Sequence, residues 1–505
     1  MPVLDQTKTP LLDAVLRYAE SGVARFHMPG HKGGRAVHER LAAALGPRTL
    51  AMDATGVLGL DDLHQPGGVI AAAQDLAAEA FGADHTFFLV NGTSAGVQAM
   101  LLAACGPGEE IIVGRNLHKS AQAGLVHSGA RPVYLRPEVE GSSSMGLGVT
   151  PDAVAEAIRQ HPGARAVLLV SPNYHGVTSE LQAIAALAHD AGMMLLVDEA
   201  HGAHFRFHSA FPQPALDAGA DMCSHGIHKV LGGLTQASML HLKGSRPDPG
   251  RVHRILQTLQ STSASYLLLA SLDAARQDAV LRGPAQLQGP LELARRLRRE
   301  LQELAPLTTF GPELVGRPGC AGLDELKVTV HTGGLGLTGQ RVEEWLRYRW
   351  NIQVEMSDLS SVLFMLGPGT RPEDLDRLLA ALQHLVGDGR QDAAGVGSQP
   401  DWTAAGPGVS ARLDVAGTPS TLPPLPPQEL SPREAFYLPA RAVPLSAARG
   451  AVSADLVTCY PPGIPILCPG ERVTAEVMAY LELIARSGLR VSGPADPSLR
   501  TLQIL

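Results

Sequence analysis

Cysteine is scarce in this chain of 505 residues. There are five cysteines, an odd number, and none of them forms a CxxC pair. They are Cys105, Cys223, Cys320, Cys459 and Cys468. Disulfide frameworks and thiolate zinc sites need cysteines at closer and more regular spacings. We therefore expect no metal site and a protein of the reducing cytoplasm.

Segments that direct a chain to a membrane or to nucleic acid are also missing. Residues 1–6 have no basic stretch followed by an apolar core, so we expect no secretory signal. Apolar runs such as 266–270 are too short to span a bilayer. The formal net charge is −8 and there is no long basic run, which argues against nucleic acid or an anionic membrane as a partner.

What the chain does contain is an alternation of strand-like and helical stretches. Hydrophobic residues make up 45% of the sequence, enough for a globular protein of two or three domains. The expected strands are 86–90, 110–113, 166–171, 194–197 and 237–242, and the expected helices are 71–81, 95–105, 151–160 and 181–191. This alternation predicts an α/β large domain with a mostly parallel, doubly wound sheet that binds ligands at the carboxyl ends of its strands.

Composition divides the chain into five segments. Residues 1–60 are expected to form an N-terminal arm, 61–305 the large domain, 306–386 a smaller α+β domain, 387–427 a linker and 428–505 a C-terminal domain. The linker is rich in Gly, Ala, Ser and Pro, a composition typical of connecting segments. The C-terminal segment has enough Leu, Ile and Val to fold as a small unit.

The most informative residues are an aspartate and a lysine near the middle of the chain. The apolar run 193–197 ends in Asp198, and Lys229 follows the next strand-like segment. Pyridoxal phosphate (PLP) chemistry needs this pair, because a lysine can hold the cofactor aldehyde as a Schiff base and a carboxylate can keep the pyridine nitrogen protonated. Without that chemistry, Lys229 would be a surface lysine and Asp198 a helix cap.

A phosphate site is expected where a strand ends in small residues and a helix begins. Gly92, Thr93 and Ser94 occupy such a turn, which offers backbone N–H groups and hydroxyls to an anion. Thr93 or Ser94 could instead be a helix cap. His228, next to Lys229, is a further candidate phosphate contact, and the hydroxyl of Thr262 could cap the phosphate or cross a subunit boundary.

Two residues are candidates for the faces of the cofactor ring. His118 follows the strand 110–113 and could stack its imidazole on one face. Ala200 is small enough to leave room on the other. A lone histidine is more often a structural group, so His118 is a candidate only because the other expected cofactor-binding residues accompany it.

Taken together, these residues resemble the Orn/Lys/Arg decarboxylase family of fold-type-I PLP enzymes, the group III decarboxylases. The matching motifs are 26–33, 59–64, 87–94, 115–120, 198–202, 228–229, 259–263, 266–273, 431–436, 460–465 and 469–471. They extend from about residue 7 to 485, interrupted by the linker.

The resemblance implies a role for each candidate. It implies Lys229 as the Schiff-base lysine and Asp198 as the partner of the pyridine nitrogen. It also implies His118 on the ring, Thr93, Ser94 and His228 around the phosphate, and Ala200 and His201 on the opposite face. Family members are dimers with active sites between subunits, so residues 26–34 and 261–263 are expected to contribute across the boundary. The flavodoxin-like domain that large members use for decamer assembly is expected to be absent, which favours a homodimer or tetramer.

Three positions depart from the family pattern. The family usually has a phosphate-binding serine three residues before the lysine, where this chain has Gly226. Residues 173–176 read Asn-Tyr-His-Gly, and Gly67 stands where an acid or threonine is common. These changes bear on cofactor affinity and substrate identity more than on the fold.

The expected activity is decarboxylation of a basic L-amino acid, with a histidine or Lys229 returning a proton to Cα. Arginine, giving agmatine, is favoured because short family members resemble biosynthetic arginine decarboxylases; lysine and ornithine stay open. Glu355 or Asp358 could receive the distal cation, or both could be solvated surface charges.

Two further classes of function are compatible with the aspartate–lysine pair. One is a fold-type-I aminotransferase or aldolase, although such enzymes usually have a small-domain arginine for the substrate carboxylate, and their motifs do not match those of this chain. The second is a non-catalytic paralogue that keeps the fold. Gly226 is the residue that keeps this second class open.

Overall fold

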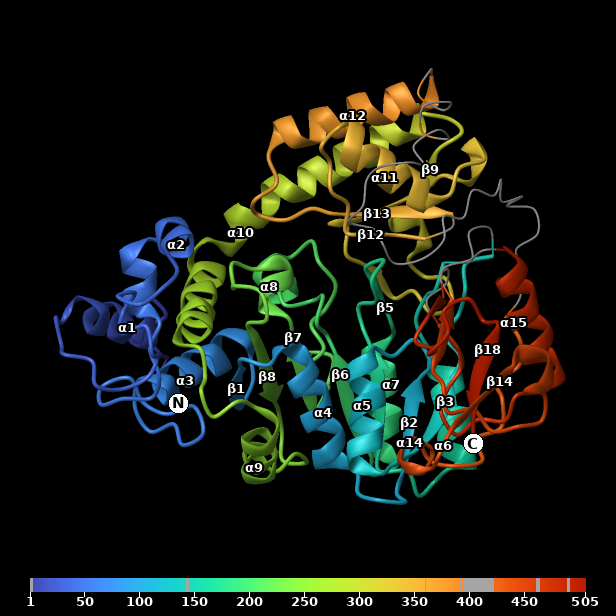
Figure 1. Cartoon of the computed structure of the whole chain (residues 1–505), viewed down its shortest axis with the longest axis horizontal. Helices are drawn as coiled ribbons and strands as arrows, with labels where there is room; N and C mark the ends of the chain where they lie inside the picture. The colour runs from blue at the N-terminus through green and yellow to red at the C-terminus, as the bar shows by residue number, and fades with distance from the viewer. Residues whose placement is uncertain are drawn as a thin grey trace.

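The computed structural model describes residues 3–141, 145–358, 360–387, 389, 393, 422–459, 464–487 and 491–505 (Figure 1). Most of the expected linker 387–427, and residues 460–463 of one family motif, lie outside this part of the chain. Among the described residues, no helix combines the length and the apolar character needed to cross a membrane.

A seven-stranded sheet forms the centre of the large domain, in the order β1-β8-β7-β6-β4-β2-β3. The strands are β1 (His85–Leu89), β2 (Glu110–Gly114), β3 (Arg131–Leu135), β4 (Ala166–Val170), β6 (Met194–Asp198), β7 (Met222–His225) and β8 (Ser238–Leu242). β3, β2, β4, β6 and β7 run parallel, whereas β8 is antiparallel to both β7 and β1. The expectation of a mostly parallel sheet is confirmed.

Alternating side chains of these strands pack against helices on both faces of the sheet. Ile111 and Val113 of β2 join the core under α4, α5 and α9, whereas Ile112 joins the core under α6 and α7. The helices are α4 (Gly92–Ala104), α5 (Lys119–Ser128), α6 (Pro151–Gln160), α7 (Leu181–Asp190) and α9 (Pro249–Leu259). Because consecutive strand residues point to opposite faces, a strand buried on both sides reads as a continuous apolar run.

The N-terminal segment packs against the β1–β8 edge. Its helices are α1 (Pro10–Glu20), α2 (Glu39–Met52), kinked at Gly46, and α3 (Val69–Phe81). Leu11 and Val15 of α1 share one core with Phe88 of β1 and Leu269 of α10 (Tyr266–Gln302). The arm is therefore partly anchored, and Asp273 strengthens the anchor by accepting the Leu11 N–H at 2.9 Å.

α10 (Tyr266–Gln302) passes from the large domain into the smaller one (Figure 1). The smaller domain has the antiparallel sheet β12-β13-β11-β9, covered by helices on one side. Its elements are β9 (Thr308–Thr309), η2 (Pro312–Leu314), β10 (Gly322–Leu323), β11 (Lys327–His331), η3 (Gly333–Leu335), α11 (Gly339–Arg349), β12 (Met356–Ser357), β13 (Ser361–Met365) and α12 (Pro372–Val386). β10 pairs with β5 (Val177–Thr178), so the two domains also share a two-stranded sheet.

The C-terminal unit has its own apolar core and lies beside the β3 edge of the large domain (Figure 1). Its elements are α14 (Pro432–Tyr437), β14 (Arg441–Pro444), η5 (Leu445–Ala447), β15 (Val457–Cys459), β16 (Pro465–Leu467), α15 (Ala475–Ser487), β17 (Val491–Ser492) and β18 (Thr501–Ile504).

One buried ion pair joins this unit to the central sheet. Arg115, just after β2, and Glu471 are 0% and 1% exposed and form two hydrogen bonds, one of them 2.8 Å long from Nη2 to Oε2. Arg115 Nε also donates to the Pro465 carbonyl at 2.8 Å. Such a pair is held in place because either charge would be costly to bury alone.

We expect Arg115→Ala to lower the free energy of unfolding by about 3–5 kcal/mol, because it leaves the Glu471 carboxylate buried without its cation. Urea unfolding followed by circular dichroism measures the change. Arg159→Ala removes an exposed helix pair with Glu156 and should change stability little. A loss in Arg115→Ala no larger than in this control would show that the pair does not anchor the C-terminal unit.

Candidate active site

The carboxyl ends of the parallel strands meet below the smaller domain. In register, Asp198 at the end of β6 lies between Val170 of β4 and Ser224 of β7. β7 leads through Gly226 into the short helix α8 (Ile227–Val230), which carries Lys229. The expected elements thus bring the aspartate and the lysine to one edge of the sheet, with Lys229 in the helical turn that follows β7.

Lys229 is half-buried and contacts a histidine. Its Nζ lies 2.8 Å from Nε2 of His201 and 5.8 Å from the centre of the Tyr174 ring. Burial lowers the pKa of the Lys229 amine, whereas the charges of Asp198 and Glu355 oppose that shift. A lowered pKa increases the fraction of neutral amine, the form that can attack an aldehyde.

Asp198 is 5% exposed, and its Oδ1 accepts the Ala200 N–H at 3.2 Å. Burial raises the pKa of the Asp198 carboxyl, and the neighbouring His118 and Lys229 act in the opposite direction. A buried carboxylate in this state is stabilised by an added cation. A protonated pyridine nitrogen has the right chemistry, so Asp198 fits PLP.

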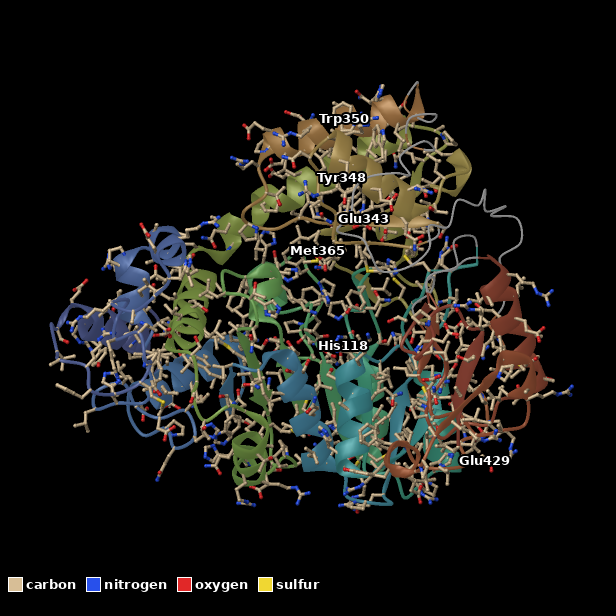
Figure 2. All side chains as sticks on the ribbon, viewed as in Figure 1. His118, Glu343, Tyr348, Trp350, Met365 and Glu429 are labelled. Atoms are coloured by element: carbon tan, nitrogen blue, oxygen red, sulfur yellow. The ribbon has the colours of Figure 1, made fainter. Side chains whose placement is uncertain are left out.

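His118 caps the N-terminus of α5 and lies at the sheet edge that faces the smaller domain (Figure 2). Its Nδ1 accepts the Ser120 N–H at 3.2 Å and lies 2.8 Å from Ser120 Oγ, which fixes the orientation of the ring. The side chain is exposed, yet the surrounding protein is dense enough for desolvation to lower its pKa, against the effect of Asp198. His118, Asp198 and Lys229 therefore share one electrostatic environment.

The predicted phosphate site lies at the start of α4. Gly92 has φ +73°, which turns the chain from β1 into the helix. The side chain of Asn91 does not cap the first amides of α4 and instead accepts the Ser261 N–H at 3.3 Å. Uncapped amides at a helix N-terminus form a ready anion site, so this end of the sheet also fits a cofactor phosphate.

Residues 236–238 connect this turn to the lysine helix. Thr93 Oγ1 lies 3.1 Å from Ser238 Oγ, and His228 Nδ1 lies 3.0 Å from the Ala237 carbonyl. Ser94 is half-buried in the first turn of α4. Thr262 is exposed next to Ser261, the residue held by Asn91. The candidate phosphate-binding residues thus lie on segments that are hydrogen-bonded to one another near the start of α4.

The structure explains why glycine occupies position 226. A Cβ atom there would lie 2.8 Å from the carbonyl oxygen of Ala200, which also accepts the Gly226 N–H at 3.2 Å. It would also crowd the Lys229 side chain, at 3.1 Å from Cδ. A serine would therefore require the backbone to shift. Ala200 is buried against this turn, at 7% exposure.

The two candidate acids of the smaller domain differ in environment. Glu355 is exposed, and its charge acts to raise the pKa values of Lys229 and Lys327. Asp358 is 4% exposed and accepts the Ser360 and Ser361 N–H groups at 2.8 and 2.7 Å. Its carboxylate is thus used to close the β12–β13 hairpin, which leaves Glu355 as the better placed acid.

Sequence reasoning missed Lys327 of β11, whose amine is buried and acts electrostatically on His201 and Lys229. The signal was a charged residue inside the apolar strand 326–330, where a lysine is rare unless it has a specific role.

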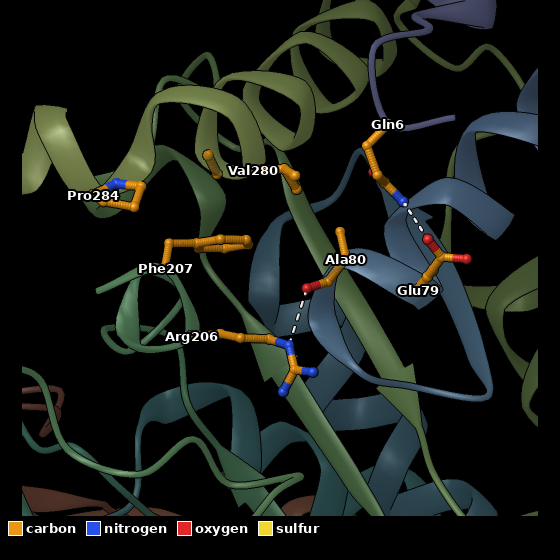
Figure 3. A pocket seen from close by; sticks show the side chains of 8 residues that line it. Gln6, Glu79, Ala80, Arg206, Phe207, Val280 and Pro284 are labelled. Carbon is orange, nitrogen blue, oxygen red and sulfur yellow. Dashed lines mark hydrogen bonds between the residues drawn. The ribbon is translucent and has the colours of Figure 1, made fainter. Parts of the chain in front are cut away.

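Two other features of the described chain do not form part of this site. Glu199, Cys223 and His225 are buried together, but Glu199 Oε2 and His225 Nε2 are 2.8 Å apart and are hydrogen-bonded to each other. A groove of about 340 Å³ lies between α3, α10 and η1 (Phe205–Phe207) (Figure 3). Its polar groups are already paired, for example Gln6 with Glu79 and Arg206 with the Ala80 carbonyl.

Comparison with known proteins matches both folded parts of the chain to one family. Residues 9–374 match the Orn/Lys/Arg decarboxylase major domain and residues 420–494 its C-terminal domain. The arginine decarboxylase of Bacillus subtilis (strain 168) is 39% identical over 502 residues, covering 99% of each chain. That of Bacillus anthracis is 38% identical over 502 residues, covering 99% of this chain and 98% of its own.

Solved structures support the same fold. Lysine decarboxylase A from Pseudomonas aeruginosa has a TM-score of 0.81 at 24% identity, covering 98% of this chain and 80% of its own. Sphingomonas wittichii serine palmitoyltransferase, with a TM-score of 0.52 at 15% identity, covers 77% of this chain and 86% of its own. The expected fold class is confirmed, and this chain belongs to the Orn/Lys/Arg decarboxylase family.

Proposed function

We propose that the protein is a PLP-dependent decarboxylase that converts L-arginine to agmatine. The observation that carries the proposal is that Lys229 and Asp198 face one site and influence each other's pKa, with His118 beside both. The choice of arginine is supported by relatives named arginine decarboxylase, which are 38–39% identical over nearly the whole chain.

Each side chain has a defined task in this proposal. The amides at the start of α4 bind the phosphate, with Thr93, Ser94 and His228 around it. Asp198 stays ionised beside the pyridine nitrogen, and His118 holds the ring in place. When bound, PLP supplies an aldehyde for covalent attachment and a ring that accepts electrons.

A proton must replace the carboxylate that leaves as CO2. Lys229 Nζ and His201 Nε2, 2.8 Å apart, can hold and exchange one proton within the site. Burial lowers the pKa of His201 well below its usual range, which keeps the ring uncharged and able to accept a hydrogen bond from the lysine.

A substrate panel of arginine, lysine and ornithine, each supplied with PLP, tests the function. We expect CO2 release and amine formation to be fastest with arginine. Faster turnover of lysine or ornithine would replace arginine as the assigned substrate. Formation of a keto acid would instead indicate an aminotransferase. Cofactor binding without any turnover would favour a non-catalytic paralogue.

We expect Glu355→Gln to raise KM for arginine at least about tenfold with a smaller effect on kcat, because a charged hydrogen bond to the guanidinium is lost. Steady-state kinetics measure both constants. Asp358→Asn is the matched control, since its carboxylate closes a hairpin, and it should lower stability while leaving KM nearly unchanged. The reverse pattern would assign the substrate cation to Asp358.

We also propose a homodimer whose partner covers the N-terminal arm. Eight large apolar side chains of residues 3–58 are exposed in the single chain, among them Phe26 at 97% and Leu58 at 100%. A concentration of exposed apolar surface marks a site of contact with another protein. Light scattering on the purified protein would contradict this proposal if it gave the mass of one chain.

A further inference from the structure

Lys327 lies in β11 with its amine enclosed by protein. The residue is 1% exposed, and among the described residues its Nζ has no hydrogen-bond partner. Burying an ammonium group without a partner is unfavourable, so such a residue is retained only when its charge or its proton has a use.

The two acids near Lys327 belong to the smaller domain, and the Lys229 charge comes from the large domain. Asp324 precedes it by three residues and its carbonyl accepts the Lys327 N–H at 3.1 Å, whereas Glu355 comes from the segment before β12. Both acids favour the charged form of Lys327, while burial and the Lys229 charge disfavour it. Asp324 also lies 3.3 Å from Nε2 of His204, another fully buried group.

Residues 173–176 connect Lys327 to the Lys229 site. A Cβ on Gly176 would lie 3.1 Å from Cγ of Lys327, and Thr329, two residues along the same face of β11, lies 3.0 Å from Nδ1 of His175. On the other side, the Tyr174 ring packs against His201 with centroids 4.9 Å apart. This short segment therefore contacts both the strand of Lys327 and His201.

His201 has one engaged nitrogen and one buried nitrogen without a partner. Its Nε2 lies 2.8 Å from Lys229 Nζ, and its Nδ1 is enclosed and makes no hydrogen bond to the described residues. If the ring were charged, two cations would be in contact inside the protein. The contact is stable only when one of the two groups is neutral.

We propose that Lys327 is a positioning residue, whose buried ammonium keeps the His201 imidazole uncharged so that Nε2 accepts a hydrogen bond from Lys229. The inference rests on the proposed role of Lys229. Burial is the largest cause of the lowered His201 pKa, and the charges of Lys327, Lys229, His118 and His204 act in the same direction.

The proton in this arrangement has a defined position. Lys229 donates to Nε2, so the ring proton of His201 lies on Nδ1. Loss of the Lys327 charge would let His201 take a second proton at higher pH, and the protonated ring could no longer accept from Lys229. Lys327 thus acts on the reaction through His201 and does not need to touch the substrate.

The test compares Lys327→Met and Lys327→Gln, which remove the charge, with Lys327→Arg, which keeps it. Histidine Cε1 signals of the full-length protein are titrated by NMR with and without PLP, and His201→Gln identifies the signal. We expect the His201 midpoint to move to higher pH in both neutral variants and to stay near wild type in Lys327→Arg. Lys243→Met, which removes a partly exposed amine paired with Asp217, is the matched control.

The pH dependence of kcat provides an independent test of the proposed role of Lys327. We expect the acidic limb of the kcat profile to move to higher pH in the neutral variants, with a loss of about tenfold below that limb. A His201 midpoint unchanged in both neutral variants, measured in folded protein, would overturn the inference. Because the NMR titration needs no turnover, it distinguishes failure of this inference from failure of the proposed decarboxylation.

Discussion

Lys229→Ala should lose decarboxylation by at least about 10³-fold, because the variant lacks both the amine that bonds the cofactor and a group that exchanges protons with His201. The protein should still fold, since Lys229 lies in the one-turn helix α8 and its side chain is only half-buried. CO2 release measures the turnover, and the absorbance of bound PLP reports the covalent link, which should disappear.

Lys243→Ala is the matched control for this experiment. It removes an amine that follows β8, pairs with Asp217 and lies outside the site. Turnover and cofactor absorbance should both survive. If Lys229→Ala kept the absorbance of the covalent link, another lysine would hold the cofactor and the site assignment would be wrong.

Asp198→Asn should lower kcat by about 10²–10³-fold while PLP stays attached, because the amide has the shape of the carboxylate without its charge. The buried carboxylate is proposed to stabilise a protonated pyridine nitrogen, and the neutral amide cannot do so. Steady-state kinetics give kcat, and absorbance spectra show whether the cofactor remains bound. We therefore expect a variant that binds PLP but turns over slowly.

Asp221→Asn provides the comparison on the same sheet. Asp221 precedes β7 at the opposite end of the strands and accepts the Leu195 N–H at 2.8 Å with the same Oδ2 that meets His189 Nε2. This variant should lose stability but keep kcat per folded molecule. A kcat for Asp198→Asn as high as that of Asp221→Asn would remove Asp198 from the proposed mechanism.

Local sequence patterns predicted most of the central sheet. The elements that they missed were missed for physical reasons. β3 (Arg131–Leu135) was missed because it begins with an arginine and a proline, which is tolerated at the edge of a sheet. α5 was missed because its sequence, KSAQAGLVHS, mixes small and polar residues without a clear apolar stripe.

Some residues of the candidate site were likewise predictable from local patterns, whereas others were not. Lys229 and Asp198 were found because each follows a strand, and parallel strands bring their carboxyl ends to one edge. Asp358 looked equal to Glu355 in the sequence, and only its hydrogen bonds to Ser360 and Ser361 separated the two. The steric reason for Gly226 likewise depends on the Ala200 carbonyl, which β6 places next to it.

The sequence by itself determined the family, the parallel sheet and the aspartate–lysine pair, because these follow from short-range periodicity and from motifs whose residues are neighbours in the chain. Only the tertiary structure decided that Arg115 meets Glu471 and that the charge of Lys327 acts on His201. Those relations join residues more than a hundred positions apart. Burial then gives their charges an effect that no local pattern encodes, because electrostatic interactions strengthen when water is excluded.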